Sequence, residues 1–132
     1  MLNRDLLIVR YKQPFVDWIN EADPQPDENP ITLAEANEDT SAFLVHDYAS
    51  EELDEWLEEN YLPLFEELLE EWYTDPAMWP QDRSLKLFRR WCDVEAHSII
   101  FDLVIHLKHT HVTRVKTNDI YFISIIDCYN LF

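Results

Sequence analysis

The 132-residue chain contains no glycine, although average usage of about 7% would give roughly nine. Phosphate-binding loops, the dinucleotide-binding turn and the nucleophile elbow of serine hydrolases all need glycine, because their backbones turn sharply or approach a ligand closely. An EF-hand calcium loop also needs a glycine at its sharp turn. The sequence therefore excludes enzymes and calcium-binding proteins of these common types.

Cysteine and basic residues are also scarce. The two cysteines, Cys92 and Cys128, form no C-x-x-C pair and no disulfide framework, which favours a reducing, cytoplasmic location. Ten basic residues stand against 27 acidic ones, so the formal net charge is −17. Nucleic acid and anionic membranes require a Lys/Arg footprint, so neither is an expected partner. Basic proteins and cations remain, and no cofactor is expected.

Long apolar runs are missing as well. None reaches the roughly 20 residues that span a bilayer, and the N-terminus lacks the cleavage site of a signal peptide. Hydrophobic residues nevertheless make up 47% of the chain and include five tryptophans. This composition predicts a folded domain with a real core.

The apolar periodicity predicts an α/β fold. Alternating and continuous apolar runs predict strands at 5–11, 42–48 and 94–103, and helical spacing predicts helices at 13–23, 32–38, 50–75 and 84–92. The order is therefore β-α-α-β-α-α-β. It favours a small three-stranded sheet packed by helices, with right-handed crossovers wherever neighbouring strands are parallel.

Local signals set the expected helix boundaries. Thr32 and Glu35 form a capping box at the start of a short helix. Ser50 is expected to cap the long acidic helix, and Pro63 is expected to kink or break that helix near residues 60–62 because it lacks an N–H. Trp79 is expected to pin the loop at 75–82.

The composition changes after Leu103. Residues 1–103 contain 25 acidic and 7 basic residues, whereas residues 104–132 contain 2 acidic and 3 basic ones. Two apolar runs, 111–115 and 120–126, predict a possible extra hairpin, and the second run is typical of an aggregation-prone segment. We therefore predict a single acidic α/β domain at 1–103 and a C-terminal extension of different composition.

The stretches RDLLIVRYKQPFVDWIN and WYTDPAMWPQDRSLKLFRRWCDVEAHSIIFDL, with the acidic helix between them, resemble a family of small acidic uncharacterised bacterial proteins. The resemblance covers residues 4 to about 103. It rests on the pattern around Lys12–Trp18, the W-P-x-D-R stretch at Trp79–Arg83, and the run from Cys92 to Ser98 without its first position. It implies a single small α/β domain and no established activity.

Two features depart from that family. Tyr11 stands where the family has proline, and family members end soon after the position of Leu103, with an acidic tail. The segment 104–132 is therefore interpreted as similar to a read-through or frame-shifted, non-native extension.

The histidines are the first candidate site. His106, His109 and His111 form H-x-x-H-x-H, in which two histidines could share a zinc ion, but no fourth ligand stands nearby and we interpret them as incidental. His46 and His97 lie in predicted strands. With Asp47, Glu95 or Asp102 near either of them, they would form the minimum of a metal-dependent or acid/base enzyme. No nucleophile accompanies them, so structural histidines are the simpler interpretation.

The long acidic helix is the second candidate site. Its carboxylates are most simply a solvated face, and the functional alternative is a docking surface for a basic partner. The expected contributors are Glu55, Glu58, Glu59, Glu66, Glu70 and, from the loop, Trp79. The leading hypothesis is thus a protein–protein interaction module without catalysis. The alternatives are the histidine enzyme and an acidic mimic of nucleic acid that occupies a DNA-binding protein.

Overall fold

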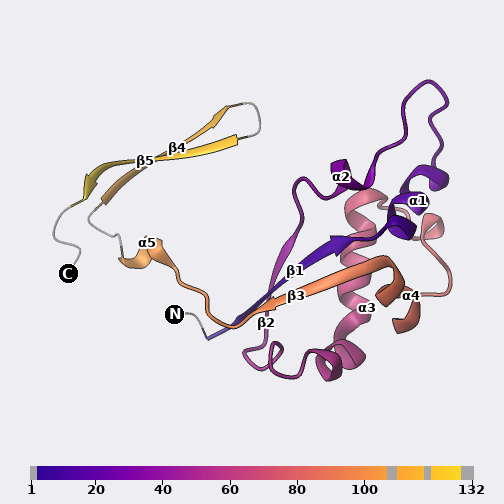
Figure 1. Ribbon diagram of the computed structural model, residues 1–132, viewed down its shortest axis with the longest axis horizontal. Helices are drawn as coiled ribbons and strands as arrows, with labels where there is room; N and C mark the ends of the chain where they lie inside the picture. The colour runs from indigo at the N-terminus through magenta and orange to yellow at the C-terminus, as the bar shows by residue number, and fades with distance from the viewer. Residues whose placement is uncertain (1–2, 107–109, 118–119, 129–132) are drawn as a thin grey trace. The chain divides into compact units, whose positions relative to one another are not determined.

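The computed structural model describes residues 3–106, 110–117 and 120–128, with side chains up to Val104. The chain divides into two compact units, one at 3–99 and the other from Ile100 onwards (Figure 1). No helix among the described residues is long and apolar enough to cross a bilayer.

The first unit contains a three-stranded antiparallel sheet in the order β2-β1-β3 (Figure 1). The central strand β1 (Asp5–Tyr11) pairs with β2 (Ala42–Val45) on one side and with β3 (Cys92–His97) on the other. The predicted α/β fold with a three-stranded sheet is therefore confirmed. The right-handed crossovers of parallel neighbours do not arise, because both pairings are antiparallel.

Asn37 takes the place of a strand partner for Tyr11, which lies beyond the first residue of β2. The Tyr11 N–H donates to Asn37 Oδ1 at 2.8 Å, and Asn37 Nδ2 donates to the Tyr11 carbonyl at 3.0 Å. One side-chain amide thus satisfies both backbone groups that the end of β1 directs toward the β2 side.

Four α-helices and one 3₁₀ turn connect the strands. They are α1 (Gln13–Ala22), α2 (Leu33–Ala36), α3 (Leu53–Trp72), η1 (Pro76–Met78) and α4 (Leu85–Trp91). The Thr32 cap is confirmed, since its hydroxyl accepts from the Glu35 N–H at 3.2 Å. The predicted strands 42–48 and 94–103 are shorter than expected, because β2 ends at Val45 before a turn at 47–50, and β3 runs from Cys92 only to His97.

The structure corrects the expected start of α3 and the expected break at Pro63. The helix begins at Leu53 rather than next to Ser50, whose N–H instead donates to the buried Asp5 carboxylate at 2.7 Å and holds Ser50 in the preceding turn. The helix also continues through Pro63 without a break. The buried Leu64 and Phe65 follow that proline, so core packing keeps the two halves of α3 in one helix.

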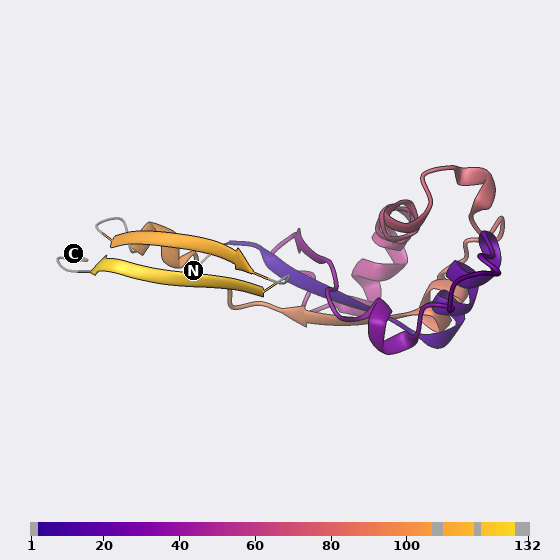
Figure 2. The same cartoon turned by 90° about the horizontal axis from the view of Figure 1, so that it is seen from above.

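The core lies between the sheet and the helices, with α3 along one side of the sheet (Figure 2). Phe15 is central to it, because its ring lies 4.4–6.5 Å from those of Tyr11, Trp18, Phe65 and Trp91. The side chains without solvent exposure are Leu7, Val9, Phe15, Val16, Ala49, Phe65, Leu68 and Leu69. The opposite face of the sheet is open, and Arg10, Ala42, Leu44, Asp93, Glu95 and His97 are exposed there.

The second unit begins with α5 (Leu103–His106). Its strands β4 (Thr110–Thr117) and β5 (Ile120–Cys128) pair antiparallel in the place of the predicted hairpin, with a register shift between His111 and Val112.

Candidate interaction surface

The helix α3 carries eight acidic residues and no basic residue. They are Asp54, Glu55, Glu58, Glu59, Glu66, Glu67, Glu70 and Glu71. Surface helices commonly gain stability from Glu–Lys pairs at i, i+4, and α3 has none. Any charge compensation must therefore come from other elements.

Three of these carboxylates have partners elsewhere in the unit. Asp54 lies 3.3 Å from Arg89 Nη1, and Glu66 lies 3.6 Å from Arg83 Nε. Glu71 accepts hydrogen bonds from the hydroxyls of Ser41 and Tyr11. The other five carboxylates are exposed and have no ion pair within 4.0 Å among the described residues. These unpaired carboxylates are Glu55, Glu58, Glu59, Glu67 and Glu70.

Four of the carboxylates lie at the C-terminal end of α3, where negative charge is electrostatically unfavourable. Glu66, Glu67, Glu70 and Glu71 occupy the last two turns of α3, where the helix dipole places partial negative charge, and no basic residue stands in the last turn. Like charges at that end destabilise the helix, so an approaching cationic surface would lower the free energy of this part of the protein.

An apolar groove of about 250 Å³ lies beside the acidic helix, between β2 and α3. A hydrogen bond from Trp56 Nε1 to His46 Nδ1, 3.3 Å long, links α3 to the residue that follows β2. The bond from Ser41 Oγ to Glu71, 2.6 Å long, links α3 to the residue that precedes β2. The groove is lined by Phe43, Leu44, Val45, Trp56, Asn60, Pro63, Leu64 and Glu67.

The side chain of Trp79 makes its contacts within the first unit. Its Nε1 donates to the Tyr73 carbonyl at 2.7 Å, and the Arg83 guanidinium lies 5.7 Å from its ring centre. Trp18 Nε1 donates to the carbonyl of Met78 in the same loop. The loop is pinned as expected, and the half-buried Trp79 leaves only part of its ring for a partner.

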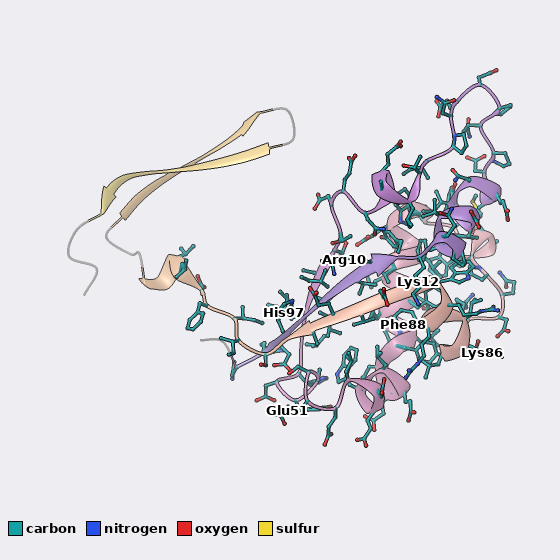
Figure 3. The ribbon with its side chains drawn as sticks, in the orientation of Figure 1. Arg10, Lys12, Glu51, Lys86, Phe88 and His97 are labelled. Carbon is teal, nitrogen blue, oxygen red and sulfur yellow. The ribbon has the colours of Figure 1, made fainter. Side chains whose placement is uncertain are left out.

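A basic groove was missed by the sequence analysis. Lys12, Lys86, Arg89 and Arg90 line a hollow of about 640 Å³ together with Asp54, Glu58 and Leu85. Lys12 is already bound, because its Nζ donates to the Arg89 carbonyl at 2.9 Å and lies 3.9 Å from Asp93. Lys12 and Lys86 lie at one end of the sheet, and His97 lies toward the other (Figure 3). The clustering of basic residues at 86–90 was the available signal.

The two histidines of the enzyme hypothesis are not brought together. His46 follows β2 and accepts from Trp56, which belongs to α3. His97 ends β3 on the other side of β1, where its Nε2 lies 2.9 Å from Glu95 on the open face. The central strand therefore separates the two rings, and they share no described contact.

The remaining candidates for catalysis or metal binding are also dispersed. Asp47 is exposed in the turn after β2, and Asp102 belongs to the second unit, where it accepts from the Val104 N–H. Among the described residues, no group of three His, Cys, Asp or Glu side chains could hold a metal ion. His109 and the side chains of His106 and His111 lie outside the described residues.

Two titratable groups, Tyr11 and Cys92, are buried in the core. Burial raises the pKa of the Cys92 thiol, so it stays protonated and is a poor nucleophile at neutral pH. Burial also raises the pKa of Tyr11 to about 12. Neither group shows the lowered pKa of an activated nucleophile.

Comparison of the chain with protein-family models, curated proteins and solved structures found no match. The resemblance to a family of small acidic bacterial proteins therefore stays a prediction. The functional proposal therefore rests on the surface of the unit at residues 3–99.

Proposed function

We propose that the chain is a cytoplasmic bacterial interaction protein that binds a basic protein through the acidic surface of α3, without catalysis. One observation carries the proposal. Five exposed carboxylates on one helix, Glu55, Glu58, Glu59, Glu67 and Glu70, have no ion pair within 4.0 Å among the described residues, although Glu58 shares a hollow with basic side chains of α4.

The physical argument has two parts. A dense, exposed charge of one sign attracts a partner of opposite charge over long range and raises the association rate. Charge alone gives limited affinity at physiological salt, because exposed pairs are screened. The apolar groove beside α3 could add the burial of apolar surface, since the centre of a stable interface is apolar and water-excluded.

The histidine enzyme finds less support, because His46 and His97 lie on opposite sides of β1. A mimic of nucleic acid would use the same carboxylates as the proposed docking surface. Competition distinguishes these two, since duplex DNA displaces a mimic from its partner and leaves an ordinary protein–protein contact intact.

A pair of charge-matched variants tests the proposal. In the first, Glu55, Glu58, Glu59 and Glu70 are replaced by Gln, which keeps the side-chain shape and removes four charges. In the control, four exposed glutamates elsewhere are replaced by Gln, so that the net charge is the same. The control positions are Glu21, Glu28, Glu35 and Glu38.

Each tagged full-length protein is used to capture bacterial proteins at low and moderate salt, and the bound proteins are quantified by mass spectrometry. We expect a basic protein that the wild type and the control retain, and that the α3 variant retains at least tenfold less. Equal retention by the two Gln variants would show that only net charge matters, and would refute a docking surface on α3.

A further inference from the structure

We propose that the outer edge of β2 binds an extended basic peptide as a fourth strand, with one apolar side chain of the peptide in the groove between β2 and α3. This inference rests on the proposed function and deepens it by naming the form of the partner. The argument uses backbone direction, the groove and the spacing of charges.

The direction of the β2 backbone follows from one hydrogen bond. The Val9 N–H donates to the Ser41 carbonyl at 3.5 Å, so Ser41 directs its backbone groups toward β1. Backbone groups alternate along a strand, so those of Phe43 and Val45 also point to β1, and those of Ala42 and Leu44 point outward. No described hydrogen bond outside the β1–β2 pairing uses the backbone of Ala42 or Leu44.

The opposite side of β1 confirms this alternation. The Lys12 N–H donates to the Trp91 carbonyl at 2.8 Å on the β3 side. Tyr11, one residue earlier, directs both of its backbone groups to Asn37 on the β2 side. The backbone N–H and C=O groups of odd-numbered residues in β1 therefore point toward β2, and those of even-numbered residues point toward β3. The edge of β2 thus offers a short row of donors and acceptors that no described residue pairs with, which is the template for strand addition.

The side chains beside this edge suit alternating residues of a peptide. Phe43 and Val45 are half-buried and line the groove with Trp56. Leu44 points to the open face of the sheet and is 57% exposed. An added strand would place one set of its side chains against the groove and the other set beside Leu44.

The charges next to the groove select a basic peptide. Glu59, Pro63 and Glu67 follow one another at i, i+4 and i+8, so they form one row along α3, and Pro63 and Glu67 line the groove. Glu59 and Glu67 are about 12 Å apart along the helix axis, from its rise of about 1.5 Å per residue. Two basic residues at i and i+4 of a strand are about 13 Å apart on one face. An apolar residue between them would enter the groove.

The other sheet edge lacks this combination. On β3 the exposed carboxylates of Asp93 and Glu95 already lie within 4.0 Å of Lys12 and Arg10, respectively. Their charges are thus compensated inside the unit. The free edge at Ala96 therefore serves as a matched control for the edge at Ala42.

The probe is a fluorescein-labelled peptide, Thr-Arg-Thr-Val-Thr-Arg-Thr, whose binding to the full 132-residue chain is measured by fluorescence anisotropy. Ala42→Pro removes an outward N–H from β2 without touching the pairing with β1, and Ala96→Pro makes the equivalent change on β3. We expect Ala42→Pro to weaken binding at least tenfold and Ala96→Pro to change it less than twofold. The double variant Glu59→Gln/Glu67→Gln should also weaken binding at least fivefold. Thermal unfolding verifies that each variant is folded.

Equal binding by the two proline variants overturns the proposal, as does equal binding of a peptide with Glu in place of Arg. A concentration-dependent dimer that Ala42→Pro abolishes would assign the edge to a second copy and also overturn it. If the peptide fails to bind while the α3 Gln variant still loses its basic partner, only the added strand is refuted. If that variant keeps its partner as well, the proposed function fails too.

Discussion

The two faces of the three-stranded sheet come from alternate residues of the same strands, yet they are held in different ways. On the covered face, Leu7 and Val9 have no solvent exposure and pack against aromatic side chains of the helices. On the open face, Arg10, Glu95 and His97 are exposed, and Glu95 forms an ion pair with Arg10 and a hydrogen bond with His97. Burial of apolar area contributes far more stability than exposed ion pairs do. The covered face therefore maintains the fold, and the open face and its edges can change without unfolding it.

The largest expected effect is a loss of packing on the covered face. Phe65→Ala should lower the free energy of unfolding by about 3–5 kcal/mol, because the ring is fully buried between Phe15, Phe88 and Trp91. Leu44→Ala on the open face should lower it by less than about 1 kcal/mol. Urea unfolding followed by tryptophan fluorescence measures both. Similar losses for the two variants would contradict the contrast between the faces.

A smaller effect is expected at the border of the covered face. Asn37→Ala should cost about 1–3 kcal/mol, because it leaves the N–H and the carbonyl of the buried Tyr11 without their partner. Asn37→Asp keeps the acceptor for the N–H and loses the donor to the carbonyl, so it should cost less than Asn37→Ala. Urea unfolding tests this order, and an alanine variant as stable as the wild type would refute the role given to Asn37.

The covered face should also make the protein sensitive to alkali. The pKa of Tyr11 is about 12 in the folded state and about 10 in an unfolded chain. Because the pKa of Tyr11 is higher in the folded state, the contribution of its protonated hydroxyl to the free energy of unfolding is complete below pH 10. That contribution is lost as pH rises toward 12. Tyr11→Phe should therefore reduce the fall of the urea midpoint over this range. The remaining fall should come partly from Cys92, whose pKa burial also raises. An unchanged pH dependence in Tyr11→Phe would contradict this.

The smallest effect is expected on the open face. The hydrogen bond to His97, and secondly the charge of Arg10, lower the pKa of Glu95. A lowered folded pKa means that its small stabilisation is present above the unfolded pKa and is lost as pH falls through the folded pKa. His97→Ala should raise the pKa of Glu95 toward its ordinary value in an NMR titration of the carboxyl carbon, and Lys86→Ala should leave it unchanged. Unaltered titration in His97→Ala would remove His97 as the cause.

Features that depend on neighbouring residues could be predicted from the sequence. The strand at 5–11, the first helix and the Thr32 cap follow from apolar spacing and from a hydroxyl three residues before its partner. The acidic surface of α3 was predictable for the same reason, because helical spacing alone separates its carboxylates from its apolar residues.

Features that depend on distant residues could not. The Ser50 cap failed because a buried carboxylate 45 residues away holds the Ser50 N–H. The basic groove was missed because Lys12 and α4 meet only when β1 and β3 pair. The free edge of β2 likewise requires the strand order, which local sequence does not contain. The proposed peptide site thus combines a predictable charge with an edge that only the fold reveals.

The position of β1 in the middle of the sheet has a consequence for synthesis of the chain. The strand that must pair on both sides is made first, and its partner β3 is made last, with about 80 residues between them. At about 5–20 residues per second, β1 and its apolar side chains wait several seconds on the ribosome before the sheet can close. During that interval the acidic residues made between the two strands, eight of them on α3, give the nascent chain a strong negative charge that repels neighbouring chains. The acidic residues would then protect the protein against aggregation before α3 serves any partner.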